Sequence, residues 1–231
     1  MPRQARSAPG GLVYHVINRS NGRSRLFGKE TDYAAFEKVL TEALARTPTR
    51  VLGWCLMPNH WHLVVWPKED GELSAFVRWL THTHSQRWHA HHHSAGRGHV
   101  YQGRFKSFPM ERDEHLLPVL RYVERNALRG GLAKRAEDWR WGSLWVRQQG
   151  PAELRRLLSA WPMEIPGDWV ERVNVAHTMS ELEALRRAVT RSSPYGSPRW
   201  MEQTAKGTES GTGALSVDWE KEKMPATVFI S

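Results

Sequence analysis

Apolar and polar positions alternate between strand-like and helix-like spacing over roughly the first half of the chain. Four segments are rich in apolar and β-branched residues and predict strands: Gly11–Arg19, Arg50–Met57, His60–Trp66 and Arg104–Met110. Two longer segments between them, Glu30–Arg46 and Glu72–His91, carry apolar residues three or four positions apart and predict helices. Thr31 or Asp32 is the expected N-cap of the first helix.

The order of these elements is strand, helix, strand, strand, helix, strand. It predicts an α+β fold of the ferredoxin-like split-βαβ type, with an antiparallel sheet and these two helices on one face. The two middle strands are expected to form a hairpin through the turn at residues 57–59, which places the third strand inside the sheet.

A third helix is predicted over His115–Arg129. Its apolar stripe consists of Leu116, Val119, Leu120, Val123 and Ala127. Pro118 must lie in its first turn, and Gly130 and Gly131 favour its end there. The aromatic segment that follows, Asp138–Trp145, is expected to form a loop.

The pattern of strands and helices predicted for the first part of the chain ends near residue 150. We expect a domain over residues 1–150, a mostly helical C-terminal extension over 151–206 and a flexible tail over 207–231. Within the extension, Ser180 and Glu183 have the spacing of a capping box and predict a helix start.

Charge is distributed unevenly between these parts. The chain carries a formal net charge of +9, and residues 1–150 hold 23 Lys and Arg against 13 Asp and Glu. A basic domain favours a polyanion such as nucleic acid, although the charge could also serve solubility alone. One cysteine and the lack of a secretory signal or long apolar run predict a cytoplasmic protein.

Two histidines in the third strand are the first candidates for chemistry. His60 and His62 are two residues apart, so on a strand they share one face while Trp61 takes the other. Two imidazoles on one face can hold a divalent cation, and the alternative is two unrelated polar residues on a solvent face. A metal site would need a third ligand from elsewhere.

The third helix offers that ligand. Tyr122 and Asn126 are four residues apart and therefore share a helix face. The amide oxygen of Asn126 suits a hard cation such as Mg²⁺ or Mn²⁺, and Tyr122 beside it could attack a phosphodiester. The alternatives are an ordinary half-buried aromatic residue and a helix-capping asparagine.

Other clusters are weaker candidates. His89, His91, His92 and His93 do not share a face and favour a solvated loop over a metal site. Tyr101 is the main rival of Tyr122 as nucleophile. Cations with neighbouring rings suit single-stranded nucleic acid, and the candidates for DNA contact are Arg3, Arg6, Arg19, Arg104, Phe105, Lys106, Arg121 and Arg125.

Five short motifs follow one another along the chain: "GLVYHVINR", "PNHWHLVV", "VYQGRFKS", "YVERN" with "LRGGL", and "DWRWGS". Over about residues 8–147 they resemble the REP-associated tyrosine transposases, a group of single-tyrosine transposases with a His–hydrophobic–His (HUH) motif related to insertion-sequence transposases. Two positions depart from that pattern, because many relatives have Asn-Pro at 126–127 and Trp-Ser-Ser at 141–143.

The resemblance implies a metal-dependent single-stranded DNA endonuclease and strand transferase acting on REP-like hairpins. His60, His62 and Asn126 would bind Mg²⁺ or Mn²⁺, and Tyr122 would form a 5′-phosphotyrosine link. A domesticated hairpin-binding protein that no longer cleaves DNA is the alternative. A monomer is expected, with a dimer as the other possibility.

Overall fold

The computed structural model describes residues 8–94, 96 and 98–209. Two of the predicted DNA-binding residues, Arg3 and Arg6, lie outside the described residues, as do residues 210–231 of the predicted tail. None of the described helices combines the length and apolar character that crossing a bilayer requires.

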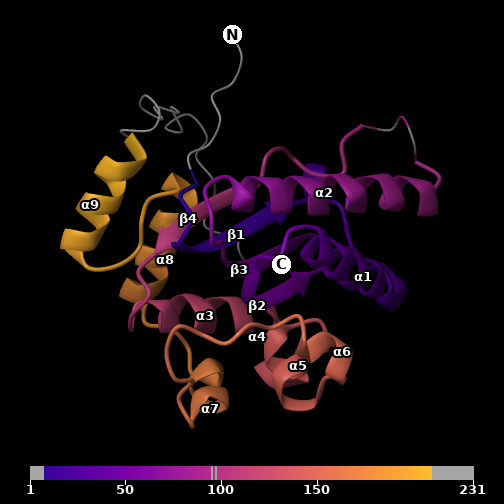
Figure 1. The fold of residues 1–231 in the computed structure, drawn as a ribbon. Coiled ribbons are helices and arrows are strands. Elements are labelled where there is room, and N and C mark those ends of the chain that lie inside the picture. Colours follow the sequence, from indigo (N-terminus) through magenta and orange to yellow (C-terminus); the bar gives the residue numbers. More distant parts are fainter. Residues whose placement is uncertain (1–7, 95, 97, 210–231) are drawn as a thin grey trace.

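A four-stranded antiparallel sheet forms the centre of the molecule (Figure 1). Its strands, in the spatial order β2-β3-β1-β4, are β1 Val13–Arg19, β2 Arg50–Met57, β3 His60–Trp66 and β4 Lys106–Met110. Strand β3, which carries His60 and His62, pairs with β2 on one side and with β1 on the other, so it is internal as predicted. The order and directions are those of the ferredoxin-like split βαβ.

Two long helices, α1 (Glu30–Arg46) and α2 (Glu72–His91), cover one face of this sheet (Figure 1). Their apolar stripes pack on strand residues that include Trp54, Trp61 and Leu63, and all three are fully buried. This core confirms the predicted placement of the first two helices.

The opposite face carries α3 Leu116–Glu124, α4 Asn126–Arg129, α7 Trp169–Asn174 and α8 Met179–Arg191. Helices α5 Ser143–Gln149 and α6 Ala152–Arg155 also contribute side chains to the first core. The other described elements are α9 Pro198–Glu209 and the short 3-10 turns η1 Asn21–Arg23 and η2 Ala136–Asp138. A second core joins α3 to this face through Val119, Leu120 and Val123, and Trp169 and Leu185 of the extension complete it. The sheet therefore lies between two helical layers.

Several local predictions were wrong. Lys29 caps α1, and Asp32 sits at its third position and accepts hydrogen bonds from the backbone. The capping box of α8 joins Thr178 to Glu181, because that helix starts earlier than predicted. Part of the expected aromatic loop is helix α5, whose Ser143 turns inward to bond the backbone of β2. Such long-range contacts override local preference.

Candidate active site

Strand pairing places the two histidines of β3 on the sheet face that α3 covers. His60 lies opposite Arg19 and His62 opposite Ile17 on the neighbouring strand β1. Both imidazoles are buried, and their ring centroids are 4.9 Å apart. Trp61 between them packs into the core on the other face, as the predicted alternation requires.

Each of these imidazoles has one nitrogen engaged by a neighbour. The Nδ1 atom of His60 lies 2.6 Å from Oδ1 of Asn59. The Nδ1 atom of His62 lies 2.9 Å from Nε2 of His15 on β1. Histidines that bind metals commonly use their second ring nitrogen for such a hydrogen bond, which fixes the ring and its tautomer. Asn59 and His15 therefore orient the pair.

Burial keeps these imidazoles neutral. Desolvation, with Arg19 and Arg129 as smaller causes, lowers the pKa of His60 to about 3. Desolvation alone lowers the pKa of His15 to about 3. The pKa of His62 also falls well below its usual value, first through burial and then through its charged neighbours. Neutral imidazole is the form that binds a metal ion.

The third helix completes the arrangement. Nδ2 of Asn126 faces Nε2 of His62 at 3.2 Å, and the ring of Tyr122 meets that of His62 edge to face with centroids 5.8 Å apart. The sequence predicted two separate pairs, His60 with His62 and Tyr122 with Asn126, and the structure brings the two pairs together. The first pair comes from β3 and the second from the α3–α4 segment that packs on it.

This donor set fits a divalent cation. It combines two neutral imidazoles whose outer nitrogens are occupied with an amide group that already faces one of them. A half-turn of the Asn126 amide would present its oxygen, the atom that Mg²⁺ or Mn²⁺ prefers. His60, His62 and Asn126 are therefore the residues that would hold the ion.

Tyr122 lies in an enclosed, positively charged setting. The residue is only 3% exposed. The guanidinium of Arg129 stands 4.9 Å from the centre of its ring, and Nη2 of Arg129 lies 3.4 Å from the hydroxyl oxygen. The rival nucleophile Tyr101 is on the other face of the sheet, where Trp61 donates to its hydroxyl.

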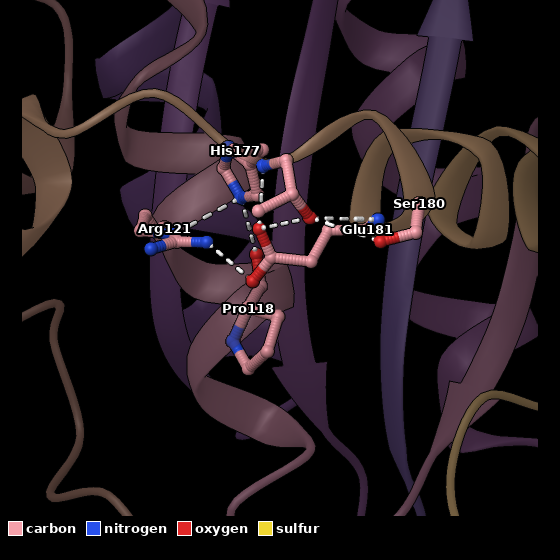
Figure 2. Close-up of polar contacts among 6 residues, drawn as sticks. Pro118, Arg121, His177, Ser180 and Glu181 are labelled. Atoms are coloured by element: carbon pink, nitrogen blue, oxygen red, sulfur yellow. Dashed lines mark hydrogen bonds and ion pairs between the residues drawn. The ribbon is translucent and has the colours of Figure 1, made fainter.

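Residues of the C-terminal extension form polar contacts with α3, the helix that carries Tyr122 (Figure 2). Nε2 of His177 lies 3.2 Å from Nε of Arg121 and 3.1 Å from the carbonyl oxygen of Pro118. Nη2 of Arg121 also donates to Glu181 at 2.6 Å. The ring of His177 then meets that of Tyr122 edge to face at 6.2 Å. We call Pro118, Arg121, His177 and Glu181 the α3 clamp.

A buried carboxylate on α3 itself, that of Glu124, connects this helix to neighbouring elements. Glu124 accepts hydrogen bonds from Ser143 Oγ at 2.6 Å and from Trp169 Nε1 at 2.7 Å, and Arg147 forms an ion pair with it at 3.5 Å. The helix passes so close to β2 that a Cβ atom on Gly53 would lie 3.1 Å from Leu120. Close packing thus fixes the axis of α3.

The remaining predicted DNA-binding residues are spread over the molecule. Arg19 ends β1 beside His60, and Arg125 lies between α3 and α4 with its Nε buried and without a hydrogen bond in the described residues. Arg121 belongs to the α3 clamp. Arg104 is exposed, and Phe105 and Lys106 are half-buried at the start of β4. Their role in DNA binding stays a prediction.

Three residues near the site were not predicted. His15 follows the same strand alternation as His60, but only the pairing of β1 with β3 brings it to His62. Arg129 is seven residues after Tyr122, two helical turns away, so the helix period could have indicated it. His177 carries no local signal, because it reaches the site from a segment far along the chain.

Comparison with known proteins identifies the family. A family model described as "Transposase IS200 like" matches residues 10–126, just over half of the chain, and this range includes all four candidate residues. A solved REP-associated tyrosine transposase bound to a REP hairpin is 18% identical with a TM-score of 0.50, covering 66% of this chain and 89% of its own.

A candidate transposase from Deinococcus radiodurans is 16% identical with a TM-score of 0.38, over 53% of this chain and 95% of its own. No curated protein matches significantly. At such identity the REP-associated structure supports the fold alone, and the family model extends over the residues of the site. The chain belongs to the IS200-like transposase family.

Proposed function

We propose that this protein is a metal-dependent endonuclease and strand transferase for single-stranded DNA, with Tyr122 as its nucleophile. One observation carries the proposal: the imidazoles of His60 and His62, the amide of Asn126 and the phenol of Tyr122 converge on one face of the sheet. A phenol beside a three-ligand metal site is a constellation suited to phosphodiester cleavage.

The proposed reaction exchanges one phosphodiester bond for another. The Tyr122 oxygen attacks the phosphorus atom and loses its proton, while the bond from phosphorus to the 3′ oxygen breaks. The products are a 5′-phosphotyrosine link and a strand ending in a 3′-hydroxyl. A bound cation would polarise the phosphate. Attack by a 3′-hydroxyl on the phosphotyrosine reverses the step, so one site can cut and rejoin without a further energy source.

Arg129 and the basic balance of residues 1–150 support an anionic substrate at this site. The guanidinium of Arg129 lies against the Tyr122 hydroxyl, where it can contact a phosphate oxygen. The similar structure of a REP-associated transposase contains a REP hairpin. We therefore propose a DNA hairpin with a flanking single strand as the substrate.

The decisive experiment is a search for the covalent intermediate. The protein is incubated with labelled hairpin DNA carrying a single-stranded flank, with Mg²⁺ or Mn²⁺, and the protein–DNA adduct is resolved on a denaturing gel. Wild type should form the adduct and Tyr122→Phe should not. Tyr195→Phe is the matched control, because that half-buried tyrosine packs near Phe108 outside the site. An adduct of normal yield with Tyr122→Phe would contradict the assignment.

A second candidate is hairpin binding without cleavage. The observation that favours it is the burial of Tyr122, since a phosphate reaches the phenol only if covering groups move. Under this reading, wild type binds the hairpin but forms no adduct with either metal, and His60→Ala leaves the affinity for the hairpin unchanged. Adduct formation by wild type excludes it.

A further inference from the structure

We propose a second metal site, for Zn²⁺ or a similar borderline divalent cation, formed by Asp32, His91 and His92. It joins the first turn of α1 to the end of α2, on the layer of helices that faces away from Tyr122. It shares no residue with the candidate active site and does not depend on the proposed function.

The three ligand atoms already lie close together. Oδ1 of Asp32 is 3.5 Å from Nε2 of His92 and 4.0 Å from Nε2 of His91, and all three atoms lie within 4.8 Å of one another. Donors bound to a tetrahedral zinc ion at ordinary bond lengths are about 3.3 to 3.5 Å apart. The exposed side chain of His91 would have to move closer to the other two donors to complete this geometry.

The carboxylate is buried and fixed. The side chain of Asp32 is 4% exposed, and its Oδ2 atom accepts hydrogen bonds from the backbone N–H groups of Gly28 at 2.8 Å and Lys29 at 3.1 Å. These bonds direct Oδ1 toward the two imidazoles. A buried carboxylate requires a positive partner, and a metal ion held by all three side chains supplies one.

His92 is also held in place. Its ring packs against that of Trp88 in a tilted arrangement with centroids 4.3 Å apart, and the Trp88 indole N–H donates to the carbonyl oxygen of Leu26 at 2.9 Å. A cavity of about 70 Å³ adjoins the three ligands and is also lined by Thr31, Ala35 and Trp88. This space leaves room for a water molecule as the fourth ligand.

The donor types select the ion. Two imidazoles and one carboxylate suit Zn²⁺, whereas Mg²⁺ and Ca²⁺ prefer oxygen ligands. The sequence favoured a solvated loop for these histidines because neighbouring histidines do not share a helix face. His91 ends α2 and His92 is its C-cap, and in the structure both rings face Asp32.

Zinc titration of the full-length, chelator-treated protein tests the site. Calorimetry is performed on wild type and on His91→Ala/His92→Ala, each also in a His60→Ala/His62→Ala background that removes the candidate active-site ligands. The proposal expects one zinc equivalent in that background and none after the further loss of His91 and His92. His82→Ala/His99→Ala, which removes two exposed histidines outside the proposed site, should bind as wild type does.

Two further measurements separate a metal site from a simple ion pair. In the His60→Ala/His62→Ala background, zinc should raise the melting temperature, and it should no longer do so once His91 and His92 are also replaced, because only a folded site binds the ion. Asp32→Asn, which keeps an oxygen for the backbone hydrogen bonds, should also lose the zinc equivalent. Undiminished zinc binding by His91→Ala/His92→Ala, or no zinc equivalent in the background variant, would overturn the proposal.

Discussion

The charge around Tyr122 is set by single residues of the α3–α4 segment. Arg129 places its guanidinium over the phenol ring and near the hydroxyl, while Asn126 between them faces His62. In a displacement at phosphorus, negative charge on the phosphate oxygens must be stabilised as the bonds change. Arg129 is the cation best placed to do this among the described residues that contact Tyr122.

Arg129→Ala should therefore slow adduct formation more than it weakens DNA binding. Loss of one well-placed donor typically costs about 10²- to 10³-fold in rate. Single-turnover rates and hairpin affinities measured side by side would separate the two effects. Arg129→Lys should recover part of the rate, and Arg155→Ala, at an exposed position on α6, should change neither. An unchanged rate for Arg129→Ala would remove its role.

At the scale of elements, the position of α3 depends on contacts from segments far along the chain. Glu124 connects it to α5 through Ser143 and to α7 through Trp169, and the α3 clamp connects it to the start of α8. The helix itself was predicted from its apolar stripe, but as one helix over His115–Arg129, whereas the structure divides this segment into α3 and α4 at Arg125. These anchors were not predicted, because α7 was not predicted and α5 was expected to be a loop.

Glu124→Ala should destabilise the fold severely. Its carboxylate is fully buried, and its loss leaves the Arg147 guanidinium and the Trp169 N–H without this partner. Breaking a buried ion pair by removing one member costs about 3 to 5 kcal/mol. Urea unfolding should report this loss, whereas Glu183→Ala, at an exposed site on α8, should stay within about 0.5 kcal/mol of wild type. Equal effects would show that Glu124 is not a specific anchor.

At the scale of the whole molecule, buried histidines couple stability to pH. Burial lowers the pKa of His84 to about 4, and those of His15 and His60 to about 3. The pKa of histidine in an unfolded chain is about 6.5. Between these values the unfolded chain binds protons that the folded protein does not, so acid favours unfolding.

The free energy of unfolding of the chelator-treated protein should therefore decrease as pH falls below about 6.5, by up to about 1.4 kcal/mol per pH unit for each such histidine. Denaturant unfolding across this range measures the slope. His84→Asn keeps an acceptor for the Tyr101 hydroxyl, which lies 2.7 Å from His84, and should make the slope shallower. An identical slope would contradict the prediction for His84.

The uneven charge of the chain also gives a prediction for DNA binding. Residues 1–150 carry the basic excess, so the affinity for a hairpin should fall steeply as salt rises. Arg104→Ala should reduce the slope of log affinity against log salt by about 0.7 to 0.9 if that residue contacts one phosphate. Fluorescence anisotropy measures it, with Arg155→Ala as the unchanged control. A full wild-type slope in Arg104→Ala would exclude the contact.

The order of the elements, and the face on which each key side chain lies, can be read from the sequence alone. Strand alternation put His60 and His62 on one side, and the helix period put Tyr122 and Asn126 together. Both patterns depend only on residues close in the chain, so they can be recognised without knowing how the elements pack. The order strand, helix, strand, strand, helix, strand likewise restricted the sheet to a familiar topology.

Which of these faces pack against each other is visible only in the folded protein. It brought His15 to His62, the clamp residue His177 to Tyr122, and Asp32 to the histidines at the end of α2. The physical reason is that these contacts join segments far apart in the chain. Their partners are selected by close packing and by the need to pair buried polar groups, which no local period encodes.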